Sequence, residues 1–141
     1  MIEYIPYEPE HFMDIAPRVS KIDFGGTIEE IAKYHAKFPA TTARVGEENI
    51  ACFGITPLWH GVGVIWGLFA SDAGKHGIEV LRASEAFLNA LMKDLRRVQC
   101  EVMAENTVAV KYIETFGFVR EGTMKNYGPN GEDYYLYARV S

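Results

Sequence analysis

The sequence predicts a single mixed α+β domain over residues 1–141, and three observations support that prediction. The chain is long enough for one hydrophobic core, and its 48% hydrophobic and 13% aromatic residues argue against disorder. Its hydrophobic periodicity changes between strand and helix spacing in the order β-α-α-β-β-β-α-β-α-β-β. Three successive strands followed by a β-α-β unit predict a mixed, mostly antiparallel sheet with helices on both faces.

The first half of the chain predicts a strand, two helices and three further strands. Pro17 would kink or divide the first helix, because proline lacks an amide hydrogen and clashes with the preceding turn. Thr27 with Glu30 three residues later has the pattern of a capping box, which starts the second helix. Gly63 and Gly67 interrupt the last strand and predict a bulge or a close backbone approach. The predicted ranges are 1–6, 8–19, 27–38, 41–45, 50–56 and 62–70, with a turn at 57–61.

The second half predicts two helices, a strand and a hairpin. Asn106 is suited to cap a helix by accepting a backbone N–H two or three residues on. Gly117 fits the left-handed position that ends many helices. Between them an apolar stripe recurs at helical spacing: Ala109, Tyr112, Ile113 and Phe116. The other predicted ranges are a helix at 77–95, a strand at 98–103, and a hairpin of 118–126 and 133–140 with a turn at 128–131.

Charge and composition argue against several classes of partner. The net charge of −5 is unlike that of nucleic-acid-binding domains, which are usually basic. No apolar run reaches the roughly 20 residues needed to span a bilayer, and the first residues lack the pattern of a signal peptide. We therefore expect no nucleic acid and no membrane as partners. The same acidic balance favours packing over base stacking for the hairpin tyrosines, Tyr127, Tyr134, Tyr135 and Tyr137.

Cysteine and histidine usage indicates a reduced protein without a metal. Cys52 and Cys100 lie far apart inside apolar runs, which predicts two core thiols in a cytosolic-type protein rather than a disulfide. The four histidines show no metal-ligand spacing. We therefore expect no metal site.

The stretch Asn106–Gly122 carries a family resemblance. It reads N-x-x-A, seven residues, G-F, two residues and E-G, and it resembles the end of a GCN5-related N-acetyltransferase (GNAT) domain. The most similar branch includes the ribosomal-protein alanine acetyltransferases, and Trp66–Gly67–Leu68 also resembles phage-encoded members. Any helix–glycine–strand joint is the simpler interpretation of the motif, but the order of elements fits the family along nearly the whole chain.

The resemblance implies the acyl-CoA N-acyltransferase (GNAT) fold and an activity. The protein would transfer an acetyl group from acetyl-CoA, its cosubstrate, to a primary amine by direct attack in a ternary complex. The alternative is an inactive binding or structural protein on the same fold, such as a phage protein associated with the virion. The expected location is cytoplasmic, or virion-associated if the protein is phage-encoded. The identity of the amine, whether a small molecule, a protein N-terminus or a lysine, stays open, as does a homo-oligomer.

The segment before the helix at Gly77 is the expected cofactor site. Backbone N–H groups and the helix dipole at such a joint suit a pyrophosphate, although the segment by itself favours an ordinary strand–helix loop with a solvated lysine. By resemblance it is the family's pyrophosphate loop, normally Arg or Gln, two residues, Gly, one residue, and Gly or Ala. Gly77 matches, but Gly74 replaces the Arg or Gln and Glu79 replaces the second small residue. Either coenzyme binding is lost, or Lys75 and His76 replace the arginine in a shifted register.

The resemblance also assigns the coenzyme arm and the catalytic acid. The strand at 62–70 would offer its backbone to the pantetheine arm, and Asn106 would lie beside that arm. The family's acid is usually a Tyr seven residues after this Asn, where the chain has Ile113. Tyr112 is one residue early and about 100° away on a helix, so it fits the core better than catalysis. The implied coenzyme-binding residues are Leu68, Phe69, Gly74, Lys75, His76, Gly77, Ile78, Asn106 and Ile113.

A general base has to take a proton from the attacking amine. The candidates are His60, at the mouth of the strand at 62–70, and Glu101 on the strand at 98–103, together with Glu47 or Glu48 in a turn. Spacing favours none of them, because His60 is equally a turn residue and Glu101 faces either solvent or a cleft. With Tyr112 as the candidate acid, these are the catalytic residues that the sequence suggests.

Overall fold

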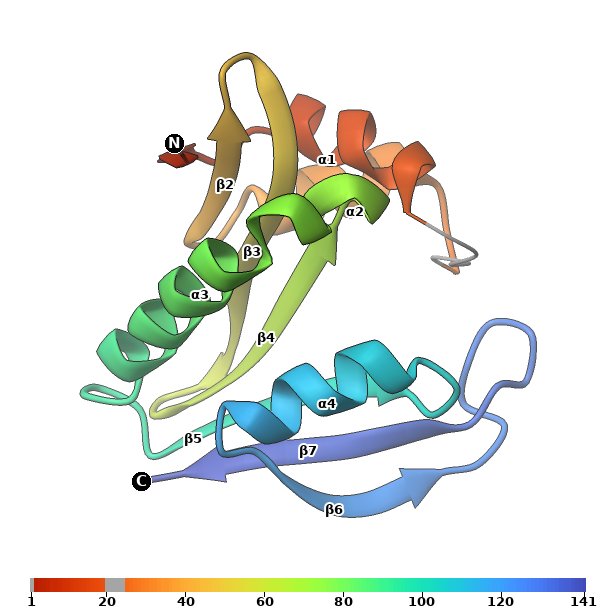
Figure 1. Cartoon of the computed structure of the whole chain (residues 1–141). Helices are drawn as coiled ribbons and strands as arrows, with labels where there is room; N and C mark the ends of the chain where they lie inside the picture. Colours follow the sequence, from red (N-terminus) through yellow and green to blue (C-terminus); the bar gives the residue numbers. More distant parts are fainter. Residues whose placement is uncertain (1, 20–24) are drawn as a thin grey trace. The chain divides into compact units, whose positions relative to one another are not determined.

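The computed structural model describes residues 2–19 and 25–141, with the backbone alone at 72–74 (Figure 1). These residues form seven strands, four α-helices and two short 3₁₀ helices, in the predicted order. The bounds are β1 Ile2–Pro6, α1 Pro9–Ile15, η1 Ala16–Arg18, α2 Ile28–His35, β2 Ala40–Val45, β3 Glu48–Trp59, β4 Val62–Phe69, η2 Ser71–His76, α3 Gly77–Leu91, β5 Arg97–Met103, α4 Thr107–Thr115, β6 Val119–Met124 and β7 Tyr134–Val140.

The strands follow the order β1-β2-β3-β4-β5-β7-β6. β4 and β5 are parallel, with Val62 opposite Arg97, while β1/β2, β2/β3, β5/β7 and β6/β7 are antiparallel. This mixed, mostly antiparallel sheet confirms the predicted fold class. The chain divides into two compact units, one of Met1–Thr56 and Ile65–Phe87 and the other of Pro57–Val64 and Leu88–Ser141.

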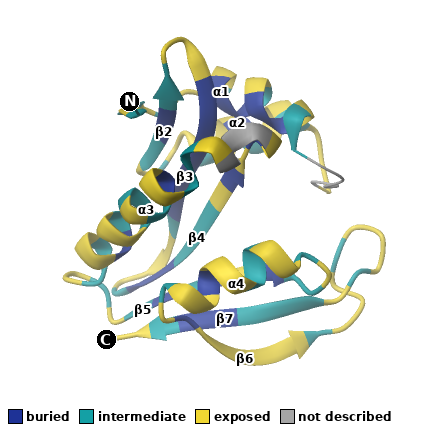
Figure 2. Cartoon of the chain, in the orientation of Figure 1, coloured by how far each residue is buried: buried dark blue, intermediate teal, exposed yellow. Residues whose placement is uncertain are grey.

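In the first unit, helices pack on both faces of the sheet. Much of β3 is buried (Figure 2). Cys52 and Phe53 are consecutive buried residues of this strand, so their side chains point to opposite faces. Cys52 packs with Phe12 of α1 in one core cluster. The Phe53 ring meets Phe87 of α3 edge-on, with the ring centroids 5.3 Å apart. The prediction of helices on both faces is therefore confirmed for this unit.

A close backbone approach joins β2 to β3 at Gly54. A Cβ atom at Gly54 would lie 2.6 Å from the carbonyl oxygen of Pro39 and 2.7 Å from the Cβ of Ala40. The amide of Ile55 donates to the same Pro39 oxygen at 3.1 Å. Only a residue without a side chain fits where the chain enters β2.

In the second unit, α4 packs against the strands through Ile113 and is tied to β7 by polar contacts. Tyr137 is fully buried, yet its Oη donates to Glu114 of α4 at 2.8 Å. The guanidinium of Arg120 lies 3.7 Å from the ring centre of Tyr135, so a cation–π contact braces β6 against β7. Packing was the sequence interpretation for the hairpin tyrosines, and Tyr137 confirms it.

Pro17 and Pro57 affect the element boundaries in different ways. α1 stops at Ile15 and Pro17 lies in η1, so the predicted division of this helix is confirmed. Pro57 was expected to end its strand, but β3 runs on to Trp59. That prediction was wrong because a strand tolerates proline wherever the ladder does not need its amide. The turn is shorter than predicted and uses Gly61, at φ +83°.

Gly63 forms no bulge in the pairing of β4 with β5. Val62, Gly63 and Val64 pair with three consecutive residues of β5 without a register shift.

α3 ends four residues earlier than predicted, at Leu91. The chain continues in turns whose amides donate back to the last helical carbonyls.

Cys52 and Cys100 are both buried and unpaired, which confirms the predicted core thiols. Burial raises the pKa of each thiol to about 12. Among residues 2–19 and 25–141, no group of three His, Cys, Asp or Glu side chains is arranged to hold a metal ion. No helix in the described part of the chain is both long and apolar enough to cross a membrane.

Candidate active site

The N-terminus of α4 has the capped geometry that the sequence predicts. The side-chain oxygen of Asn106 accepts from the amide of Ala109 at 3.1 Å. The helix ends at Gly117, whose φ of +85° is left-handed, and the Phe118 amide donates back to the Ile113 carbonyl at 3.2 Å. The cap occupies only the oxygen of Asn106, so its Nδ2 remains a donor for a ligand.

Tyr112 and Ile113 lie on different sides of α4. Ile113 is only 8% exposed and belongs to the core, whereas Tyr112 is 43% exposed. The preference for Tyr112 as a core residue was therefore wrong. The inward stripe is narrower than the apolar pattern suggests, because one helical residue turns the side chain by about 100°. The phenol of Tyr112 is open to solvent, and its role as an acid stays a prediction.

Glu101 on β5 has a phenol as its partner. The Tyr127 hydroxyl lies 2.8 Å from each carboxylate oxygen of Glu101, and Tyr127 is half exposed. This hydrogen bond is the main reason that the pKa of Tyr127 lies above its usual value, so the phenol stays a donor. An ionised carboxylate has about four lone-pair sites, so Glu101 keeps the capacity to accept a proton. Sequence reasoning missed Tyr127, since 26 residues separate it from Glu101.

His60 is exposed in the turn between β3 and β4. Its carbonyl accepts from Arg96 at 2.9 Å, which fixes the turn rather than the imidazole. The parallel register sets Val62 of β4 opposite Arg97 of β5. His60 comes two residues before Val62 and Glu101 comes four residues after Arg97, so six residues separate their levels along the strands. At about 3.3 Å per residue this separation is roughly 20 Å. His60 and Glu101 therefore do not act on one proton together.

Leu68 and Phe69 alternate between the two faces of β4. Leu68 is buried in the core cluster beneath α1, whereas Phe69 is exposed. The Phe69 ring lies across Gly67, where a Cβ would be 2.8 Å from the ring. Gly67 thus makes room for a side chain. What Leu68 and Phe69 can offer a ligand in common is their backbone.

The predicted loop before Gly77 is helical, so the expectation of an open glycine loop was wrong. Ser71–His76 form η2, which continues directly into α3 at Gly77. In a 3₁₀ helix each amide beyond the first turn donates to the carbonyl three residues back, so fewer amides face outward than in an open loop. The hydroxyl of Ser71 donates to the Arg18 carbonyl at 2.6 Å and holds the start of η2.

Lys75 and His76, the two basic residues before Gly77, differ in the charge they can offer a ligand. Lys75 is exposed, and Ile78 is also exposed on the first turn of α3. His76 Nδ1 lies 3.9 Å from the carboxylate of Glu79, so a protonated His76 would be partly neutralised by its own helix. Lys75 is therefore the stronger of the two replacements for the family's arginine.

Comparisons with solved structures agree on one architecture. The ribosomal-protein-S18-alanine N-acetyltransferase of Escherichia coli is similar with a TM-score of 0.81 and 17% identity, over 99% of this chain and 94% of that chain. Ard1 from Thermoplasma volcanium is similar with a TM-score of 0.81 and 16% identity, over 99% of this chain and 97% of that chain. A GNAT-family acetyltransferase from Bacillus anthracis is similar with a TM-score of 0.75 and 19% identity, over 99% of this chain and 94% of that chain.

The chain has the GNAT fold. This statement concerns architecture, because all three identities are below 25%. No protein-family model matches the sequence, and no curated protein matches it either.

The two residues that depart from the family's pyrophosphate loop can now be placed in the structure. Gly74 lies within η2 and Glu79 lies on the first turn of α3. A carboxylate at a helix N-terminus interacts favourably with the dipole but repels an anionic ligand. The sequence could reveal these substitutions, but the conversion of the loop into a 3₁₀ helix has no marker that periodicity detects.

Proposed function

We propose that this protein is an acetyl-CoA-dependent N-acetyltransferase that acts on a primary amine in a ternary complex. The observation that carries the proposal is the GNAT fold, shared over 99% of the chain with two solved structures whose names state N-acetyltransferase or acetyltransferase activity. The capped Asn106 at the start of α4, in the motif Asn106–Gly122, supports it.

The chemistry is a direct transfer. The amine lone pair attacks the thioester carbonyl carbon, the C–N bond forms, and the C–S bond breaks to release the thiolate of coenzyme A. Most of the rate would come from holding amine and thioester together. Backbone amides of β4 around Leu68 and Phe69 would polarise the carbonyl, and Asn106 Nδ2 would bind the pantetheine arm.

Glu101 is the base that the local geometry favours. The Tyr127 hydroxyl holds both carboxylate oxygens in one orientation, whereas the contact of His60 with Arg96 is made by its backbone carbonyl. A positioned base contributes about 10²–10⁴ in rate. The thiolate needs little help, because free thiols have a pKa of about 8.5, so either Tyr112 or water can supply its proton.

A second candidate, a non-catalytic binding protein on the same fold, has one observation in its favour. The segment expected to bind pyrophosphate is a 3₁₀ helix followed by Glu79, and the family's usual tyrosine position is the buried Ile113. Such a protein would release no coenzyme A with any amine.

Calorimetric titration with acetyl-CoA separates the two candidates, with coenzyme A and ATP as control ligands. Micromolar binding of acetyl-CoA, followed by release of free thiol on addition of amines, is the outcome we expect. Gly77→Asp should weaken binding at least about tenfold, because it adds a negative charge beside the phosphates. Gly122→Asp is the matched control, since a Cβ there meets no atom within 4 Å. Absence of binding at millimolar acetyl-CoA would contradict the enzyme.

A further inference from the structure

Helix α1 begins with a cap that is closed by a histidine. Glu8 is the N-cap residue, and its backbone amide donates to Nδ1 of His11 at 3.1 Å. The His11 amide donates back to the Glu8 carbonyl oxygen at 2.9 Å. In the usual capping box, a Glu or Gln side chain three residues on accepts the N-cap amide. Here the acceptor is an imidazole nitrogen, which loses its lone pair when it is protonated.

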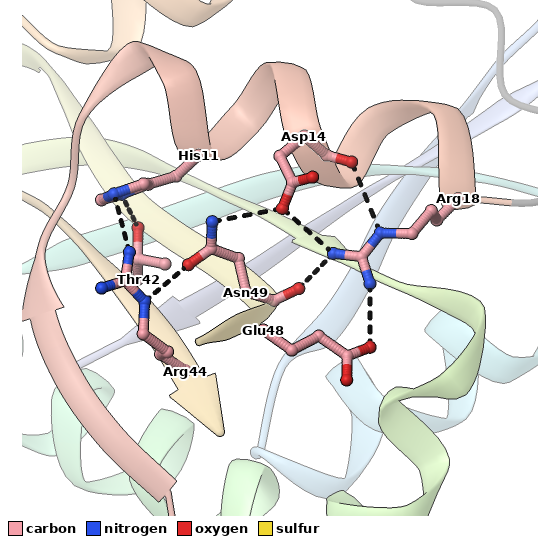
Figure 3. Close-up of polar contacts among 7 residues, drawn as sticks. All are labelled: His11, Asp14, Arg18, Thr42, Arg44, Glu48 and Asn49. Carbon is pink, nitrogen blue, oxygen red and sulfur yellow. Dashed lines mark hydrogen bonds and ion pairs between the residues drawn. The ribbon is translucent and has the colours of Figure 1, made fainter. Parts of the chain in front are cut away.

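His11 lies at the buried end of a polar network that joins α1 to β2 and β3 (Figure 3). The residue is 6% exposed, and its Nδ1 lies 2.8 Å from the hydroxyl of Thr42. Arg44 connects the ring to Asn49, with 3.4 Å from Nη2 to His11 Nε2 and a 2.9 Å bond from Nε to Asn49 Oδ1. Asn49 in turn donates to Asp14 at 3.2 Å. The Glu8 amide and Thr42 therefore contact the ring at Nδ1, while the Arg44 guanidinium lies beside Nε2.

The hydrogen bond from the Glu8 amide is the contact that assigns the ring proton. Because Nδ1 accepts the Glu8 amide, the neutral ring carries its proton on Nε2. Nε2 lies 3.6 Å from the Glu8 carboxylate, which suits a donor, and 3.4 Å from Arg44 Nη2, which is itself a donor and so makes no hydrogen bond to a protonated Nε2. A second proton has only Nδ1 to occupy, where it would point at the Glu8 amide hydrogen.

The charges that face the ring come from α1, its N-cap and β2. Glu8, Glu10 and Asp14 favour a protonated ring, while Arg44 and burial oppose it. Burial is the largest effect, and the pKa of His11 lies below the usual histidine value. At neutral pH the cap is therefore closed.

We propose that His11 is a proton-controlled cap of helix α1, closed when the ring is neutral and open when it is protonated. On protonation Nδ1 becomes a donor, and the Thr42 hydroxyl rotates to accept it. The Glu8 amide is only a donor, so it loses its acceptor. The first turn of α1 then frays around Glu8 while the ring stays bonded to β2 through Thr42.

NMR on the full chain tests this proposal. At pH 7.5 the ring nitrogen shifts of His11 should identify Nδ1 as unprotonated and Nε2 as protonated. As the pH falls, exchange of the Glu8 amide should become about fivefold faster relative to its intrinsic rate, which corresponds to the loss of one hydrogen bond. The midpoint should equal that of the His11 ring. In His11→Gln, whose carbonyl accepts at every pH, the protection of Glu8 should stay constant.

Three results would overturn the proposal: a protonated Nδ1 at pH 7.5, Glu8 protection that stays constant while His11 titrates, or a Glu8 midpoint that differs from that of the His11 ring. All three are measured on the unaltered chain. The proposal therefore remains testable even if His11→Gln does not fold.

Discussion

At the scale of single residues, the neighbouring groups determine the pKa of His35 and the orientation of Glu101. His35 stacks on Trp66, with the ring centroids 3.9 Å apart, and its Nδ1 is buried without a hydrogen-bond partner among the described residues. Burial lowers the pKa of His35 to about 4. Glu101 on β5 accepts a hydrogen bond from Tyr127, which lies in the connection between β6 and β7. No local sequence pattern indicates this pair.

His35 should make folding stability depend on pH. The unfolded chain binds a proton near pH 6.5 and the folded chain only near pH 4, so stability is full above pH 6.5 and is lost as the pH falls toward 4. We expect urea unfolding to give a free energy about 1–2 kcal/mol lower at pH 5 than at pH 7 from this residue. His35→Phe, which keeps a stacking ring, should remove that part of the difference. An unchanged pH dependence in the variant would contradict the assignment.

Glu101→Gln tests the base at the same scale. The expected result is a kcat lower by about 10²–10⁴ with an unchanged dissociation constant for acetyl-CoA. His60→Gln is the comparison variant and should keep its kcat. If the two variants exchange these phenotypes in steady-state assays, the base is His60.

At the scale of elements, short contacts decide which residues are tolerated. Gly54→Ala should destabilise the fold by about 1–3 kcal/mol, because its Cβ would overlap the backbone entering β2. Gly122→Ala on β6, with no atom within 4 Å of its Cβ, should change stability by less than about 0.5 kcal/mol. Urea denaturation of both variants makes the comparison, and equal losses would rule out the close approach as the cause.

Asn106 allows capping to be separated from coenzyme binding. Asn106→Asp keeps a side-chain oxygen for the Ala109 amide, so stability should be unchanged, whereas Asn106→Ala should cost about 1 kcal/mol. Both variants lack Nδ2 and should bind acetyl-CoA more weakly. Denaturation and calorimetry on the same samples give the two readouts. Full affinity in Asn106→Asp would show that Nδ2 does not touch the ligand.

At the scale of the whole molecule, element order could be predicted from the sequence, but the strand order and the contacts between distant residues could not. Periodicity and the caps at Thr27 and Asn106 locate the helices, because those signals are local. The insertion of β7 between β5 and β6 depends on long-range pairing. The Glu101–Tyr127 pair and the helical η2 likewise depend on contacts between distant residues.

Ligand binding should also be visible in the stability of the whole chain. Acetyl-CoA at 100 times its dissociation constant should stabilise the folded state by about 2.7 kcal/mol, because only the folded chain binds it. A thermal shift series with acetyl-CoA, coenzyme A and ATP measures this effect. A transition temperature that does not move with acetyl-CoA would favour the non-catalytic candidate.

The two buried thiols have a consequence for the proposed use of acetyl-CoA, which is a reactive thioester. With a pKa of about 12, Cys52 and Cys100 hold almost no thiolate at neutral pH. Only the thiolate attacks acyl groups and disulfides readily. The protein should therefore neither acetylate itself on sulfur nor form mixed disulfides with oxidised coenzyme A. Intact-mass spectra after prolonged incubation with acetyl-CoA or oxidised coenzyme A should therefore show the unmodified chain.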